Sequence, residues 1–161
     1  MRFFRPSHRV VPAHPAEAAA IARLYERSWE DAGATLNPAA LREVVPSREE
    51  VVAWFGGGFE IYRTEQDSTL VGAVRLSFPA GSCHLDQLVV IPPFRRRGHG
   101  RSLVEHALGR ARRAGATRVW AQVSPRLHPG QAFFASMGFQ VSSPNPVVLA
   151  GEPVLPLELA V

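Results

Sequence analysis

The feature that most restricts the fold is a junction at residues 85–115, where an apolar run passes through a glycine-containing loop directly into a helix-like segment. The run "LDQLVVI" reads as a strand, and "PPFRRRGHG" follows it without a spacer. Residues 98–115 then predict a helix with one apolar face, formed by Leu103, Val104, Ala107, Leu108 and Ala111. Backbone N–H groups at a helix start are unpaired, and glycines let a ligand approach them, so the junction favours an anion site.

The other periodic segments predict a mixed chain. Further helices are expected at 14–33, 47–58 and 128–138, and strands at 8–13, 59–65, 68–79, 82–91, 117–124, 139–143 and 153–161. The short connections between residues 59 and 91 favour an antiparallel meander, which is followed by a β-α-β-α-β segment. Residues 142–153 are expected to form a turn or loop between two late strands.

Two of these helices carry more specific patterns. The first is expected to bury a face formed by Ile21, Leu24, Tyr25, Ser28 and Trp29. In the second, Ser47 and Glu50 have the spacing of a capping box.

The 161 residues predict one domain, 1–161, with 46% hydrophobic and 20% charged residues. The sequence lacks an apolar run long enough to span a membrane and a signal-peptide pattern, so we expect a cytoplasmic protein without a membrane partner. Its single cysteine, Cys83, excludes an internal disulfide and any site with several cysteine ligands. No pairs of histidine and cysteine show ligand spacing, so no metal is expected.

The net charge of +4 belongs to the second half, where residues 81–161 hold nine arginines against four acidic residues. Every basic residue is arginine, which excludes a lysine nucleophile or base. No DNA-binding or RNA-binding motif accompanies this charge, and no aromatic residues are interleaved with the basic run, so a nucleic-acid partner is not expected.

Two common nucleotide-binding loops are excluded by spacing. The sequence has no G-x-x-x-x-G-K-[ST], and the dinucleotide fingerprint fails because Leu103 stands where its third glycine is needed. The junction therefore predicts a pyrophosphate site of another kind.

"VIPPFRRRGHGRSLV" resembles the acyl-CoA-binding motif of the GNAT acetyltransferase superfamily, a strand ending V-x-P followed by [RQ]-x-x-G-x-[GA] at a helix start. "AFFASMGF" is similar to the family's second landmark, which ends in G-F at Gly138 and Phe139. The element order also matches, so the resemblance covers nearly the whole chain. It implies an α+β fold with a mostly antiparallel sheet, splayed parallel strands 4 and 5, and about four flanking helices.

The same resemblance implies acetyl-CoA as co-substrate. The main chain of residues 88–90 would bind the pantetheine arm, and the amides of residues 96–102 the pyrophosphate, with His99 as a helix-start residue beside the phosphates. Phe134 would lie near the sulfur. The expected cofactor residues are Leu88, Val89, Val90, Arg95, Arg96, Arg97, Gly98, His99, Gly100, Arg101, Ser102 and Phe134.

The implied reaction is N-acetylation of a primary amine, on a small molecule or a protein, by direct attack on the thioester. An N–H of Val89 or Val90 would polarise the carbonyl. Many family members have a tyrosine at the position of Phe134, as general acid for the thiolate. Its replacement leaves a second hypothesis open, a non-catalytic module of the same fold that senses acyl-CoA.

Candidates for the general base are Asp86, His84 and His128, although a structural hydrogen bond is the commoner role for each residue of this kind. His84 and Asp86 alternate along one strand, so they share a face unless a bulge intervenes. Dimerisation through the late strands is expected by analogy only.

Overall fold

The computed structural model describes residues 8–30, 37–125, 128–143, 145–149 and 151–161. Its strands are β1 (Val10–Pro12), β2 (Glu60–Gln66), β3 (Thr69–Ser77), β4 (Cys83–Val90), β5 (Arg118–Val123), β6 (Gln140–Val141), β7 (Val147–Leu149) and β8 (Glu152–Ala160). Its helices are α1 (Ala18–Ser28), α2 (Pro38–Val44), α3 (Arg48–Gly56), α4 (His99–Arg113) and α5 (His128–Ser136), with short 3-10 segments η1 (Pro15–Glu17) and η2 (Pro92–Phe94).

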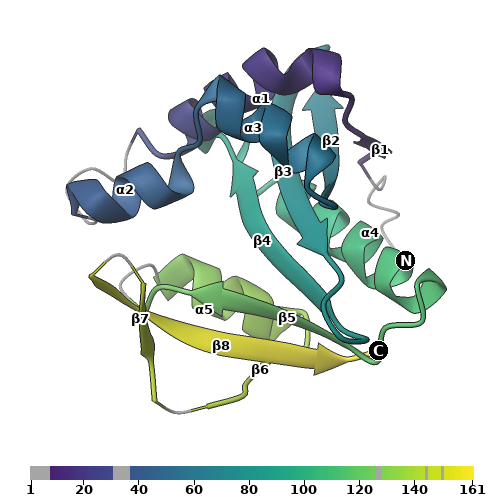
Figure 1. Ribbon diagram of the computed structural model, residues 1–161, viewed down its shortest axis with the longest axis vertical. Helices are drawn as coiled ribbons and strands as arrows, with labels where there is room; N and C mark the ends of the chain where they lie inside the picture. Colours follow the sequence, from purple (N-terminus) through teal and green to yellow (C-terminus); the bar gives the residue numbers. More distant parts are fainter. Residues whose placement is uncertain (1–7, 31–36, 126–127, 144, 150) are drawn as a thin grey trace, which may run out of the picture.

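The strands form one mixed sheet in the order β1-β2-β3-β4-β5-β8-β6. β7 pairs with the first residues of β8, 152–154. All neighbours are antiparallel except β4 and β5, which run parallel. Figure 1 shows these two strands side by side at one end and diverging toward the other. The α+β fold with splayed parallel strands is confirmed.

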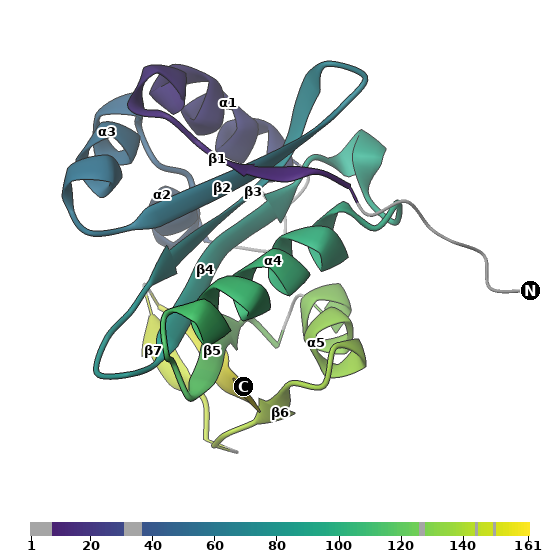
Figure 2. The ribbon, with the colours of Figure 1, turned by 90° about the vertical axis from the view of Figure 1, so that its right-hand side faces the viewer.

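Helices cover both faces of the sheet, and each face has its own apolar core. α1 and α3 lie on one face, whereas α4 and α5 lie on the other (Figure 2). The core beneath α1 and α3 includes Ile21, Val51 and Val71, and the core beneath α4 includes Leu103 and Leu76. Burial of these side chains from water is the main force that fixes the helices against the sheet.

The buried faces of the two long helices follow the periodicity of the sequence. In α4 the predicted residues Leu103, Val104, Ala107, Leu108 and Ala111 are all buried. In α1 the predicted face is buried except for Trp29, which caps the helix and is half-buried. Ser47 caps α3, since its hydroxyl accepts a hydrogen bond from the Glu50 amide at 3.1 Å.

Two elements differ from the expectation. α2 spans seven residues, too few for a periodic apolar pattern to stand out, so the structure has five α-helices instead of about four. β7 lies within the stretch expected to be a loop. Its side chains are exposed, with Val148 at 69%, and they therefore lack the alternation that marks a half-buried strand.

Gly72 brings β3 unusually close to its neighbours. A Cβ on this residue would lie 3.0 Å from the Val89 carbonyl oxygen and 3.1 Å from Leu103 Cδ1. Both neighbours belong to packed elements, so neither can move away cheaply.

We expect Gly72→Ala to lower the free energy of unfolding by about 1–3 kcal/mol, the usual cost of overpacking a core. Gly56→Ala is the matched control, because a Cβ there meets nothing within 4 Å. Chemical denaturation of both variants measures the difference. Equal stability of the two would show that β3 and β4 have room to separate.

Candidate functional site

The gap between β4 and β5 is the first element of the site. Two Cα pairs define their register, Cys83 with Val119 and His84 with Trp120. In the described part of the chain the two strands pair no further, although β4 continues to Val90. The edge of β4 that faces this gap therefore offers main-chain groups to a ligand.

A bulge at Gln87 shapes the second half of β4. Gln87 has a φ of 50°, and the register with β3 shifts between Ala73 and Arg75. The Tyr25 hydroxyl donates a 2.6 Å hydrogen bond to the Gln87 carbonyl and so ties α1 to the bulge. Burial raises the pKa of Tyr25, so this hydroxyl keeps its proton.

The hydrogen bonds of β4 with β3 show which of its groups are open. Ile91 donates its amide to the Val71 carbonyl at 2.9 Å, and antiparallel pairs alternate between bonded and non-bonded. The polar groups of Val89 therefore face β3, whereas those of Leu88 and Val90 face the gap. Of the three residues expected to bind pantetheine, Leu88 and Val90 have the suitable orientation.

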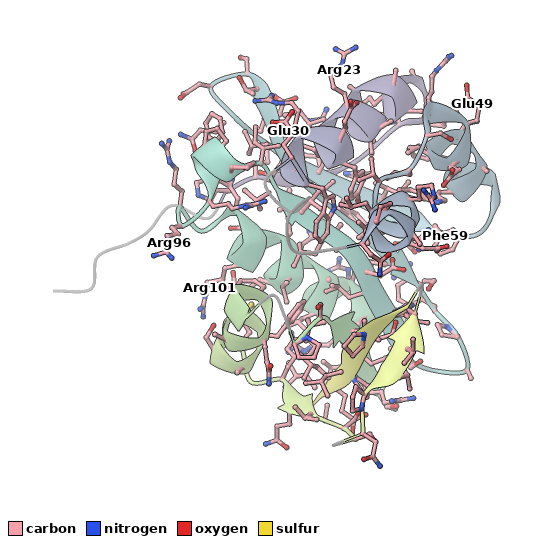
Figure 3. The ribbon with its side chains drawn as sticks, turned by 90° about the vertical axis from the view of Figure 1, so that its left-hand side faces the viewer. Arg23, Glu30, Glu49, Phe59, Arg96 and Arg101 are labelled. Atoms are coloured by element: carbon pink, nitrogen blue, oxygen red, sulfur yellow. The ribbon has the colours of Figure 1, made fainter. Side chains whose placement is uncertain are left out.

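Arg95 fastens the end of β4 rather than pointing away from the protein. Its Nε donates to the Val90 carbonyl at 2.8 Å, and a terminal nitrogen donates to the Ser28 carbonyl at 2.7 Å. One guanidinium thus joins the last residue of β4 to the last residue of α1. The other loop arginines are also exposed. Arg97 lies over the Phe94 ring at 5.1 Å, and Arg96 and Arg101 project outward on one side of the molecule (Figure 3).

The start of α4 presents open amides beside the end of β4. Gly98 caps the helix with a φ of 88°, a left-handed conformation that favours glycine. The Ser102 amide donates to the Gly98 carbonyl at 3.0 Å, which leaves the amides of residues 99–101 ahead of the first helical bond. Gly100 lies close to β4, since its Cβ position is 3.9 Å from Val90 Cγ2.

His99 sits differently from the expectation of a side chain beside the phosphates. The residue is 1% exposed, and its Nε2 donates to the Gln66 side-chain oxygen at 2.7 Å. It therefore faces β2, and its main-chain N–H is the group that remains at the helix start.

Asp86 and Arg75 form an ion pair on the opposite face of the sheet from α4. Two guanidinium nitrogens donate to the two carboxylate oxygens, at 2.8 and 2.5 Å. The guanidinium carbon also lies 4.5 Å from the Trp54 ring centre and 4.1 Å from that of Phe59. The carboxylate of Asp86 is therefore already engaged by this bidentate pair.

His84 is the other candidate base on the same strand, and the bulge lies beyond both residues, so they share a face. Its ring stacks on Trp120 with centroids 3.7 Å apart, and its Nε2 is buried with no hydrogen-bond partner in the described structure. Burial lowers the pKa of His84; the charge of Asp86 opposes this shift, and Arg75 adds to it. The imidazole is consequently neutral near pH 7.

The remaining predicted residues lie on α5. Phe134 is 6% exposed and packs edge-on against Phe133 and Phe139, with ring centroids 5.2 and 5.1 Å away. His128 is the first residue of α5, but its side chain lies outside the described part of the structure. Its role as a base stays a prediction.

The sequence did not predict the partners of two residues of β4. Asp86 is bonded by Arg75, and the Gln87 carbonyl accepts from the Tyr25 hydroxyl. Arg75 stands between the apolar residues Val74 and Leu76 of β3. A charged residue in such a strand indicates that an oppositely charged group lies on the same face of the sheet. Tyr25 was placed on a buried helix face, but a periodic pattern does not reveal that its hydroxyl needs an acceptor. Among the described residues, no group of three His, Cys, Asp or Glu is arranged to hold a metal ion, and no helix is long and apolar enough to cross a membrane.

Solved structures of other proteins share the fold of this chain. The PaiA N-acetyltransferase of Thermoplasma acidophilum, solved in complex with coenzyme A, has a TM-score of 0.76 at 17% identity and covers 93% of this chain and 98% of its own. The ribosomal-protein-alanine N-acetyltransferase of Brucella melitensis has a TM-score of 0.76 at 18% identity, covering 95% and 99%. At these identities the likeness shows the fold.

Sequence similarity adds a shorter and a longer match. The mycothiol acetyltransferase of Gordonia bronchialis is 54% identical over 52 residues, which make up 32% of this chain and only 16% of that protein. Residues 19–139 match the model of the acetyltransferase (GNAT) family, well over half of the chain. The chain therefore belongs to the GNAT acetyltransferase family.

Proposed function

We propose that the protein is an N-acetyltransferase that moves the acetyl group of acetyl-CoA onto a primary amine of a small molecule or a protein. The observation that carries this proposal is one continuous surface of open main-chain groups. It begins at the gap in the sheet with Leu88 and the Val90 N–H, while the Val90 carbonyl is bonded to Arg95, and it continues past Gly100 to the amides at the start of α4. A thioester arm followed by a pyrophosphate fits this order.

The pantetheine arm would lie along β4 and hydrogen-bond its outward-facing groups. The pyrophosphate would accept hydrogen bonds from the amides of residues 99–101 at the positive end of the α4 dipole. Arg96 and Arg101, both exposed beside this helix start, would add charge. We therefore propose that the residues predicted from the sequence bind acetyl-CoA, with three exceptions. Val89, Arg95 and the side chain of His99 would hold the binding surface in place without contacting the ligand.

The chemical step needs an acceptor for one proton and a donor to one oxygen. The Val90 N–H would donate to the thioester oxygen as negative charge develops on it. We assign His84 as general base because its imidazole is neutral and its Nε2 is unpartnered, whereas both oxygens of Asp86 already bind Arg75. The amine nitrogen bonds to the acetyl carbon, His84 takes the amine proton, and the carbon–sulfur bond breaks to release CoA as a thiolate.

Protonation of that thiolate would fall to solvent or to the substrate, because Phe134 has no proton to give. A thiolate is a good leaving group, so the step proceeds without a protein acid. The apolar ring also favours a second candidate function, a module that binds acyl-CoA without turning it over.

A release assay separates the two functions. We expect free thiol to appear when the protein is mixed with acetyl-CoA and a panel of primary amines, measured with a chromogenic disulfide. Tight CoA binding by calorimetry with no thiol release from any amine would support the sensing module instead.

Arg101→Gln should weaken CoA binding about tenfold or more, because loss of one hydrogen bond to a charged group costs roughly 1.5 kcal/mol or more. Arg112→Gln is the matched control, since Arg112 is an exposed arginine at the other end of the same helix. Titration calorimetry gives both affinities. If the two variants lost the same amount, the effect would come from net charge and the phosphates would lie elsewhere.

His84→Gln should lower kcat about 100-fold or more, as for loss of a general base. In the unaltered protein we expect kcat/KM to fall as the pH drops through the His84 pKa, which burial places below the ordinary 6.5. This acid limb should vanish in His84→Gln and persist in Asp86→Asn. A limb lost in Asp86→Asn alone would assign the base to Asp86.

A further inference from the structure

Two histidines, His8 and His99, are stacked together at the start of α4. The Nε2 of His8 lies 2.6 Å from the Arg97 carbonyl oxygen, and its ring stacks on that of His99 with centroids 3.7 Å apart. Figure 2 shows the beginning of β1, just after His8, beside the loop that leads into α4. His8, which is 89 positions away from Arg97 in the sequence, thus contacts the loop.

The hydrogen bonds fix the tautomers of both rings. A carbonyl can only accept, so His8 carries its proton on Nε2; the Gln66 oxygen likewise accepts from Nε2 of His99. His99 Nδ1 is buried without a partner. Burial lowers the pKa of His99, and the neighbouring His8 and Arg97 lower it further, which favours the neutral form of the His99 ring.

This cluster acts on the peptide unit that directly precedes the amides of residues 99–101, which would hold the pyrophosphate. The Arg97 carbonyl belongs to the same peptide unit as the Gly98 amide, so a donor on that carbonyl sets which way the amide points. The His8 ring also lies against Gly98, 3.7 Å from where a Cβ would be. His99 anchors the first residue of the helix to the end of β2.

We propose that His8 and His99 are positioning residues for coenzyme binding: the stacked pair holds the Arg97 carbonyl turned inward, so that the amides at the start of α4 point out to the pyrophosphate. The inference rests on the acetyl-CoA site proposed above. We assign neither side chain a contact with the ligand, because the Nε2 of each is already bonded to an oxygen of the protein. Their effect is confined to the half of the ligand that carries phosphate.

The test compares two ligands by calorimetry, CoA and pantetheine, which lacks the pyrophosphate and nucleotide. His8→Ala should weaken CoA binding about fivefold or more, as for loss of one hydrogen bond with its partner left unpaired, and leave pantetheine binding unchanged. His8→Phe, which keeps a ring over His99 but has no N–H, should lose as much. His14→Ala is the control, because His14 is an exposed histidine that, like His8, precedes β2 in the chain.

The outcomes separate the two proposals. If the unaltered protein bound neither ligand, the acetyl-CoA site itself would be wrong. If it bound CoA and the His8 variants bound CoA equally well, the site would stand and the positioning role would be overturned. Equal weakening for CoA and pantetheine would also overturn it, since that pattern indicates general destabilisation.

Discussion

The parting of β4 from β5 is the constraint on which the site depends. After Cys83 and His84 the two parallel strands no longer share hydrogen bonds, and main-chain groups that a closed sheet would use internally are left open. Such groups are costly to bury without a partner, so the gap is stable only if water or a ligand supplies one. The bulge at Gln87, held by Tyr25, gives the second half of β4 its separate course.

The two faces of the sheet carry different groups. On the α4 face lie the open amides of the helix start that we propose as the pyrophosphate site. On the α1 and α3 face, Arg75 lies between aromatic rings and a carboxylate, and His84 lies flat on Trp120. Aromatic stacking and a bidentate pair both restrict rotamers, which keeps the groups nearest the proposed reacting atoms in fixed positions.

The sequence was a good guide wherever local chemistry decided the structure. Periodic apolar residues set the buried face of α4, and Gly98 set its start because few other residues tolerate the left-handed backbone there. The strand-loop-helix order predicted the open amides at the start of α4 without knowledge of the tertiary contacts. The sequence did not predict contacts between distant residues. Nothing near His99 indicates that its ring turns toward Gln66, 33 positions earlier. The Arg75–Asp86 pair likewise depends on the register between two strands, which a bulge shifts.

The guanidinium of Arg95 has a further consequence. It bonds at once to the Ser28 carbonyl at the end of α1 and to the Val90 carbonyl at the end of β4. Displacement of α1 relative to β4 by an incoming acceptor would strain one of these charge-assisted bonds. If a ligand on either side of the sheet moved one of these elements, its binding would be linked to binding on the other side, and such linkage acts equally in both directions.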